Sequence, residues 1–206
     1  MRHTTPIVAT RWLSVFAAVL VLIQGIAGCA TTERSWRATS PDAIDSPAPQ
    51  TEFRAVWVAT VANIDWPSEP GLTAAQQQAE ALAILDQAQA LNLNAVVLQI
   101  RPHGDALYPS EIEPWSSYLT GTQGRDPGYD PLRFWLDESH ARGLELHAWL
   151  NPFRAAHPAD GSALSPDHIA VTRPDLVRDV GEYKWLDPAE PEAREHSLAV
   201  VADVLE

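Results

Sequence analysis

The sequence predicts an α/β fold, the N-terminal portion of a (β/α)8 TIM-type barrel with about three βα units. Buried-type strands alternate with amphipathic helices, the order typical of parallel α/β proteins. Polar side chains follow each predicted strand, as expected of a barrel whose active site draws on many strand ends. No glycine-rich phosphate loop follows a strand, which argues against a nucleotide-binding fold. A complete barrel takes about 250 residues, so we expect the 206-residue chain to be part of a longer protein.

The composition is that of one ordinary domain with an acidic surface. The hydrophobic content is 46%, enough for a single core, and the formal net charge is -13. An acidic chain is a poor partner for nucleic acid, which we therefore exclude. Eight Trp and 17 Pro favour the aromatic-rich loops common in carbohydrate-active proteins. The single cysteine excludes an intrachain disulfide.

Residues 1–28 are predicted to be a lipoprotein signal peptide. Arg2 and Arg11 precede or flank a short apolar run, Trp12–Ile23, that is too short to span a membrane comfortably. Small residues then lead to Cys29, the arrangement of a bacterial lipobox, although an ordinary signal peptide with an incidental cysteine has the same features. Lipidation of Cys29 would anchor the protein in the bacterial cell envelope facing the periplasm, with the outer membrane favoured over the inner.

The mature chain is expected to begin with a flexible tether, residues 29–51, rich in Ser, Thr, Pro and Ala. The domain, residues 52–206, opens with a strand over Phe53–Val61. Asp65 and Trp66 follow it, and they suit a sugar through a carboxylate and a stacking ring. A turn aspartate and a packing tryptophan explain the same two residues equally well.

The first helix and second strand are the clearest elements. Thr73 and Gln76 form a capping box for a helix over Thr73–Leu91. The strand beginning at Ala95 is apolar on both faces and ends at Arg101, which either makes a structural ion pair or presents a cation to a ligand. The loop that follows carries acidic and aromatic side chains: Asp105, Tyr108, Glu111, Glu113 and Trp115.

The third unit starts at Asp130, an N-cap followed by Pro131, and its helix ends at Gly143. A strand over Leu144–Asn151 places His147, Trp149 and Asn151 on one face. The chain is expected to be loop-like from Pro152 to Gly181 and extended at Tyr183–Pro188. A last helix covers Pro191–Glu206, with an apolar stripe of Leu198, Val201 and Leu205.

Five sequence blocks resemble the glycosyl-hydrolase-like 10 family of bacterial envelope lipoproteins. The resemblance runs from residue 53 to about 205 and rests on the following blocks: Phe53–Pro67, Gln99–Pro102, Ala106–Ser110 with Pro114–Ser116, Pro127–Leu132, and His147–Arg154. It implies a barrel glycosidase that cleaves peptidoglycan glycan strands already stripped of stem peptides, with division-site proteins as partners. It also implies an acid-rich motif after the fourth strand, beyond Glu206, which would hold the main catalytic carboxylates.

Within the chain, Asp105 is our candidate for catalysis, because glycoside hydrolysis uses two carboxyl groups. Side chains expected to bind the glycan are Arg101, Tyr108, His147, Asn151, Arg154, Asp65 and Trp66. Arg101, Asp105, His147 and Asn151 are predicted to meet at one barrel mouth. The spacing of His140, His147 and His157 does not suit a metal site, so we predict no metal and no cofactor. The competing function is a non-catalytic glycan-binding envelope lipoprotein.

Overall fold

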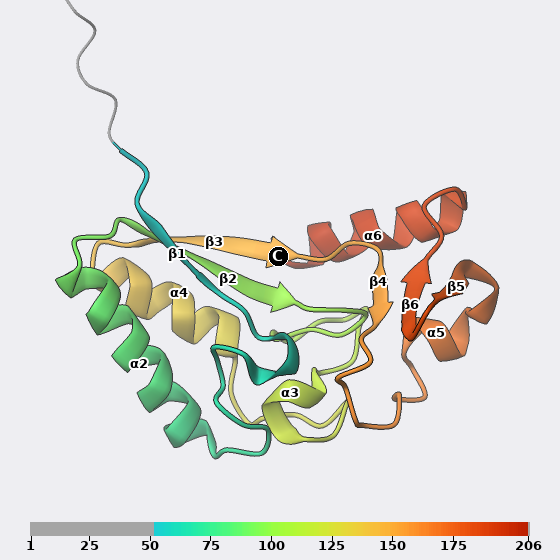
Figure 1. The fold of residues 1–206 in the computed structure, drawn as a ribbon, viewed down its shortest axis with the longest axis horizontal. Helices are drawn as coiled ribbons and strands as arrows, with labels where there is room; N and C mark the ends of the chain where they lie inside the picture. The colour runs from blue at the N-terminus through green and yellow to red at the C-terminus, as the bar shows by residue number, and fades with distance from the viewer. Residues whose placement is uncertain (1–51, 206) are drawn as a thin grey trace, which may run out of the picture. The chain divides into compact units, whose positions relative to one another are not determined.

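The structure is a computed structural model that describes residues 52–205. The predicted signal peptide, Cys29 and the tether lie outside the described residues. The first part of the domain is a parallel three-stranded sheet in the order β1-β2-β3 (Figure 1). Its strands are β1 (Ala55–Val58), β2 (Ala95–Arg101) and β3 (Glu145–Leu150).

Two helices connect these strands and cover one face of the sheet: α2 (Ala74–Ala90) and α4 (Pro131–Ala141) (Figure 1). Neighbouring strands thus follow one another in sequence, and each connection runs through a helix on the same side. Consecutive βα units of a (β/α)8 barrel have this arrangement. The predicted fold class is confirmed.

The core lies between the sheet and these helices. All seven residues of β2 are buried. Because side chains alternate along a strand, Val96, Leu98 and Ile100 face the helices, where they pack with Leu85 and Trp135. The same alternation sends Gln99 and Arg101 to the opposite face. The apolar strand therefore fills the core on one side and delivers polar groups on the other.

The predicted helix starts are confirmed. The Thr73 hydroxyl accepts a hydrogen bond from the backbone N–H of Gln76, whose side chain accepts from the Thr73 N–H, completing the capping box of α2. Asp130 caps α4 by accepting from the Arg133 N–H at 2.9 Å. Gly143, with φ of +71°, follows the end of α4 in the left-handed region that favours glycine.

The prediction of a loop from Pro152 to Gly181 is wrong. This segment contributes β4 (Arg154–Ala156) and β5 (Val177–Val180), which flank β6 (Tyr183–Leu186) in a small antiparallel sheet of order β4-β6-β5. It also holds α5 (Ile169–Thr172) and the 3-10 helix η2 (Pro174–Leu176). Each strand has three or four residues, too few for a period-two pattern to stand out.

Two further short helices form: η1 (Val61–Asn63), which begins at the last residue of the predicted first strand, and α3 (Ser117–Thr120), which lies in a predicted loop. The last helix, α6 (Pro191–Asp203), turns a different face inward than predicted. Its buried residues are Ala193, Ser197 and Val200. The predicted apolar stripe is exposed by 69% at Leu198, 43% at Val201 and 83% at Leu205. Small side chains allow close packing here, and the Ser197 hydroxyl donates to the Pro152 carbonyl at 2.7 Å. Within residues 52–205, none of the helices combines the length and apolar character that a membrane crossing demands.

Candidate active site

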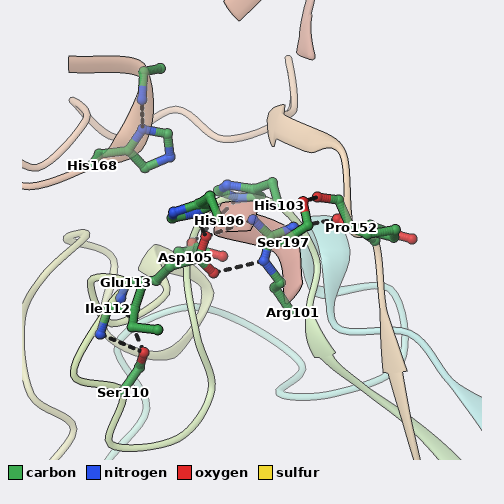
Figure 2. A network of polar contacts seen from close by, with 12 residues as sticks. Arg101, His103, Asp105, Ser110, Ile112, Glu113, Pro152, His168, His196 and Ser197 are labelled. Atoms are coloured by element: carbon green, nitrogen blue, oxygen red, sulfur yellow. Dashed lines mark hydrogen bonds and ion pairs between the residues drawn. The ribbon is translucent and has the colours of Figure 1, made fainter. Parts of the chain in front are cut away.

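The carboxyl end of β2 carries a buried ion-pair network (Figure 2). The Nε and Nη2 atoms of Arg101 donate to the two carboxylate oxygens of Glu113 at 2.7 and 2.6 Å, and both side chains are 1% exposed. His196 of α6 places Nε2 2.9 Å from Oε1 of Glu113. Arg101 Nη1 also donates to the backbone carbonyl of Asn151. Of the two alternatives for Arg101, the structure therefore shows the structural ion pair.

The loop after β2 is shaped to hold Glu113 in this network. The Ser110 hydroxyl accepts from the backbone N–H groups of Ile112 and Glu113 at 3.1 and 3.0 Å (Figure 2). Burial by itself would raise the pKa of Glu113. The Arg101 charge and the hydrogen bonds from His196 and Arg101 outweigh burial and hold that pKa below its usual value.

A second buried cluster adjoins this network and contains His103, Asp105 and Asp160. His103 Nε2 lies 3.4 Å from Asp105 Oδ2 and 3.5 Å from Asp160 Oδ2. The first two side chains are fully buried and the third is 6% exposed. Burial lowers the pKa of His103 to about 4, against the attraction of Asp160. Burial raises the pKa of Asp105 to about 7, against its hydrogen bonds to Ser116 and Gln123.

Neighbouring groups orient the two carboxylates. Asp160 Oδ1 accepts from the Ser117 hydroxyl at 2.8 Å and from the Ser162 N–H at 3.0 Å. Gln123 Nε2 donates to Asp105 Oδ2 at 3.3 Å. The remaining oxygens, Asp105 Oδ1 and Asp160 Oδ2, are buried without a hydrogen-bond partner, as are both ring nitrogens of His103. One ligand atom from each of the three residues lies within 4.8 Å of the others, so this group could hold a metal ion.

A pocket of about 580 Å³ opens beside this cluster. Its walls come from segments that follow strands: the loop after β1, helix α3, and residues 159–162 after β4. Its polar lining comprises Asn63, Ser68, Glu69, Ser117, Tyr118, Asp160 and Ser162. Asp160 thus belongs both to the buried cluster and to the pocket wall.

Asp65 and Trp66 take the structural roles that the sequence left open. Trp66 is fully buried, donates its Nε1–H to the Gln77 carbonyl at 2.9 Å, and packs edge-to-face on Trp135. It therefore offers no exposed face for a sugar. Asp65 is exposed, and its carboxylate accepts from the Ala59 N–H at 2.8 Å, which closes the turn after β1.

The predicted meeting of four residues at one mouth is wrong for His147. His147 pairs in register with Val97. It precedes Asn151 by four residues, which places the two about 13 Å apart along the strand. Its side chain is 45% exposed and contacts Glu145 at 3.0 Å. Asn151 does lie at the strand end, where its side chain donates to the Pro102 carbonyl at 2.9 Å and shapes the turn.

The other predicted side chains divide between core and surface. Asp105 and Tyr108 are buried, the latter 4% exposed, and burial raises the pKa of the Tyr108 hydroxyl. Arg154 on β4 is half-buried, with its guanidinium carbon 6.0 Å from the ring centre of Tyr183 and 5.5 Å from that of Trp185. Arg154 therefore makes cation–π contacts with two aromatic rings of β6.

Three residues of the site were missed from the sequence: His103, Asp160 and His196. The first carried a usable signal, because His103 and Asp105 form a His-x-Asp pair directly after a buried strand. The residue between them is Gly104, where a side chain would not fit because a Cβ would lie 2.8 Å from His168 Nε2. Asp160 and His196 come from distant segments with no recognisable pattern.

Comparison with known proteins places the chain in a family. A model of the family described as glycosyl hydrolase-like 10 matches residues 52–206. Glycosyl hydrolase YngK of Bacillus subtilis is 48% identical over 155 residues, covering 75% of this chain and 30% of that protein. Glycosyl hydrolase DigH of Escherichia coli K12 is 37% identical over 209 residues, covering 92% of this chain and 48% of that protein. The chain thus spans less than half the length of these two curated relatives.

Two solved glycosidase structures show weaker similarity. The α-L-fucosidase isoenzyme 1 of Paenibacillus thiaminolyticus aligns over 74% of this chain and 37% of its own, at 15% identity and a TM-score of 0.40. An α-amylase of Lactobacillus plantarum aligns over 72% of this chain and 34% of its own, at 18% identity and a TM-score of 0.41. The family match and the sequence relatives are decisive by themselves: the chain belongs to the glycosyl hydrolase-like 10 family.

Proposed function

We propose that this protein is a glycoside hydrolase of the bacterial cell envelope that acts on peptidoglycan glycan strands lacking stem peptides, or on a related polysaccharide. Membership of a glycosyl hydrolase-like family supports the reaction type. The lipobox-like sequence at Cys29 supports the location. The family resemblance implies division-site proteins as partners.

The observation that carries the proposal is the polar pocket beside the strand ends. Glu69 and Asp160 contribute carboxylates, and Ser68 and Ser117 contribute hydroxyls, to the residues that line a space of about 580 Å³. Sugar rings present many hydroxyl donors and acceptors, which a wall of carboxylates and hydroxyls satisfies.

Among the described residues we assign the pocket to glycan binding. Asp105, our candidate for catalysis, is fully buried and is not among the residues that line the pocket. Hydrolysis uses two carboxyl groups about 5–9.5 Å apart on either side of the scissile bond. The family resemblance assigns that pair to the segment after the fourth strand.

The test uses cell-wall sacculi from which an amidase has removed the stem peptides, with untreated sacculi for comparison. The purified protein should sediment with the amidase-treated sacculi and release soluble saccharides detected by mass spectrometry. Binding without release would favour the glycan-binding lipoprotein, and neither binding nor release would exclude both functions.

A pair of matched variants places the glycan in the pocket. Glu69→Gln removes a charged acceptor from the pocket wall and should weaken binding to stripped strands at least about tenfold, the usual effect of losing a hydrogen bond to a charged group. Glu195→Gln, an identical change on the exposed side of α6, should leave binding unchanged. Equal binding by the two variants would remove the pocket from the proposal.

A further inference from the structure

We propose that His103, Asp105 and Asp160 form a binding site for one divalent transition-metal ion of the zinc type. The three residues come from two separate segments, the loop after β2 and the loop after β4. The site was not expected from the sequence, where the spacing of the other histidines indicated no metal.

The two distances from His103 to the carboxylates fit a shared metal ion better than direct hydrogen bonds. His103 Nε2 lies 3.4 and 3.5 Å from the nearest carboxylate oxygens of Asp105 and Asp160. Ligand atoms held at ~2.0–2.2 Å by one tetrahedral zinc ion are about 3.3–3.6 Å apart. N–H···O hydrogen bonds are shorter, typically about 2.7–3.2 Å.

The unsatisfied atoms of the cluster point to the same ligand. His103 Nε2, Asp105 Oδ1 and Asp160 Oδ2 are buried and have no hydrogen-bond partner among the described residues. Leaving one such group unpaired typically costs about 1–3 kcal/mol. A cation would satisfy His103 Nε2 and Asp160 Oδ2 together, and it would neutralise two carboxylates that share a buried space.

The supporting contacts resemble the outer shell of a metal site. Ser117 and Ser162 bind one oxygen of Asp160 and leave the other directed toward His103. Gln123 donates to Oδ2 of Asp105, the carboxylate oxygen that also faces His103. Such contacts orient metal ligands in advance. An imidazole nitrogen disfavours Mg²⁺ and Ca²⁺, which prefer oxygen, and so selects the zinc type.

The ion would connect the pocket wall to the end of the central strand. His103 and Asp105 directly follow β2, whereas Asp160 lines the pocket. Three protein ligands leave a fourth tetrahedral position for water. Binding would therefore fix residues 159–162 in the position that completes the pocket, independently of which glycan the pocket takes.

The test is a Zn²⁺ titration of the untagged full chain after chelator treatment, followed by isothermal calorimetry. We expect one ion per chain with a dissociation constant below about 1 μM, as is usual for folded zinc sites. His103→Gln and Asp160→Asn should each weaken binding more than about 100-fold, since losing an outer-shell contact alone costs about 10–100-fold. Zn²⁺ should also raise the melting temperature of the wild type and of neither variant.

Two controls make the result specific. His140→Gln changes an exposed histidine on α4, and Cys29→Ser removes the single thiol; both should bind Zn²⁺ as the wild type does. If a cluster variant fails to fold, visible absorption of the Co²⁺-loaded wild type decides, since a tetrahedral nitrogen–oxygen site gives an intense band. The absence of tight binding, or binding lost equally in His140→Gln or Cys29→Ser, would overturn the proposal.

Discussion

Arg101 and Glu113 show how one buried charge pair can look like a binding site from sequence. Each side chain is 1% exposed, and each makes short bidentate contacts with the other. Glu113→Gln would leave the Arg101 charge buried against a neutral amide. We expect it to lower the free energy of unfolding by about 3–5 kcal/mol, the usual cost of removing one partner of a buried pair, as measured by urea unfolding at pH 7.

The control for this prediction is the exposed Arg133–Asp137 pair, whose side chains are 68% and 55% exposed. Asp137→Asn should cost less than about 1 kcal/mol, because surface ion pairs contribute little. A similar loss in both variants would contradict the special role of the buried pair.

The same pair predicts how stability depends on acid. Because the pKa of Glu113 is below its ordinary value of 4.5 in the folded state, the stability it contributes is present above about pH 4.5. That stability is lost as the pH falls through the lowered folded-state pKa. Arg101 remains charged over this whole pH range. Among the described residues, the other titratable group that faces the Glu113 carboxylate is His196. As the pH falls from about 4.5 through the lowered pKa of Glu113, the free energy of unfolding of the Glu113→Gln variant should therefore decrease less than that of the wild type.

At the scale of elements, local signals decided where helices begin. Asp130 binds the Arg133 N–H at the start of α4, a group that would otherwise lack an intrahelical partner. Asp130→Ala should lower the free energy of unfolding by about 1 kcal/mol, seen as a lower urea midpoint by circular dichroism. Asp137→Ala, in the exposed middle of the same helix, serves as control. An effect of Asp130→Ala no larger than the control would show that the cap contributes nothing.

The short strands and the buried face of α6 were not predicted, because contacts with distant segments, rather than local signals, determine them. Strands β4, β5 and β6 are held by pairing with one another rather than by a pattern within each. In α6, the sequence offers Leu198 and Leu205 as an apolar stripe, yet Ala193 and Ser197 are the residues buried. Small side chains let the helix approach the chain at Pro152, a contact between segments 45 residues apart.

At the scale of the whole molecule, the proposed lipid anchor defines where the protein acts. Cys29→Ser removes the thiol that the lipobox-like sequence presents, so we expect the variant to leave the membrane fraction or to remain unprocessed. Labelled fatty acid should be incorporated into the wild type and not into the variant, as read by gel fluorography. Failure of the wild type to incorporate the label would exclude lipidation at this position.

The sequence by itself determined the α/β class, the three parallel strands, the helix caps of α2 and α4, and the family. These follow from local patterns: runs of apolar residues, capping residues, and blocks shared with relatives. It also singled out the end of β2, where Arg101 and Asp105 do lie in the polar site.

Only the tertiary structure decided which polar side chains meet there. Asp160 joins His103 across 57 residues, and His196 joins Glu113 across 83 residues. Trp66 lies in the core and His147 lies far from the carboxyl ends of the strands, although both are residue types suited to a sugar site. A side chain's type is local information. Its burial and partners depend on segments that the fold brings together from distant parts of the chain, and no short-range pattern records them.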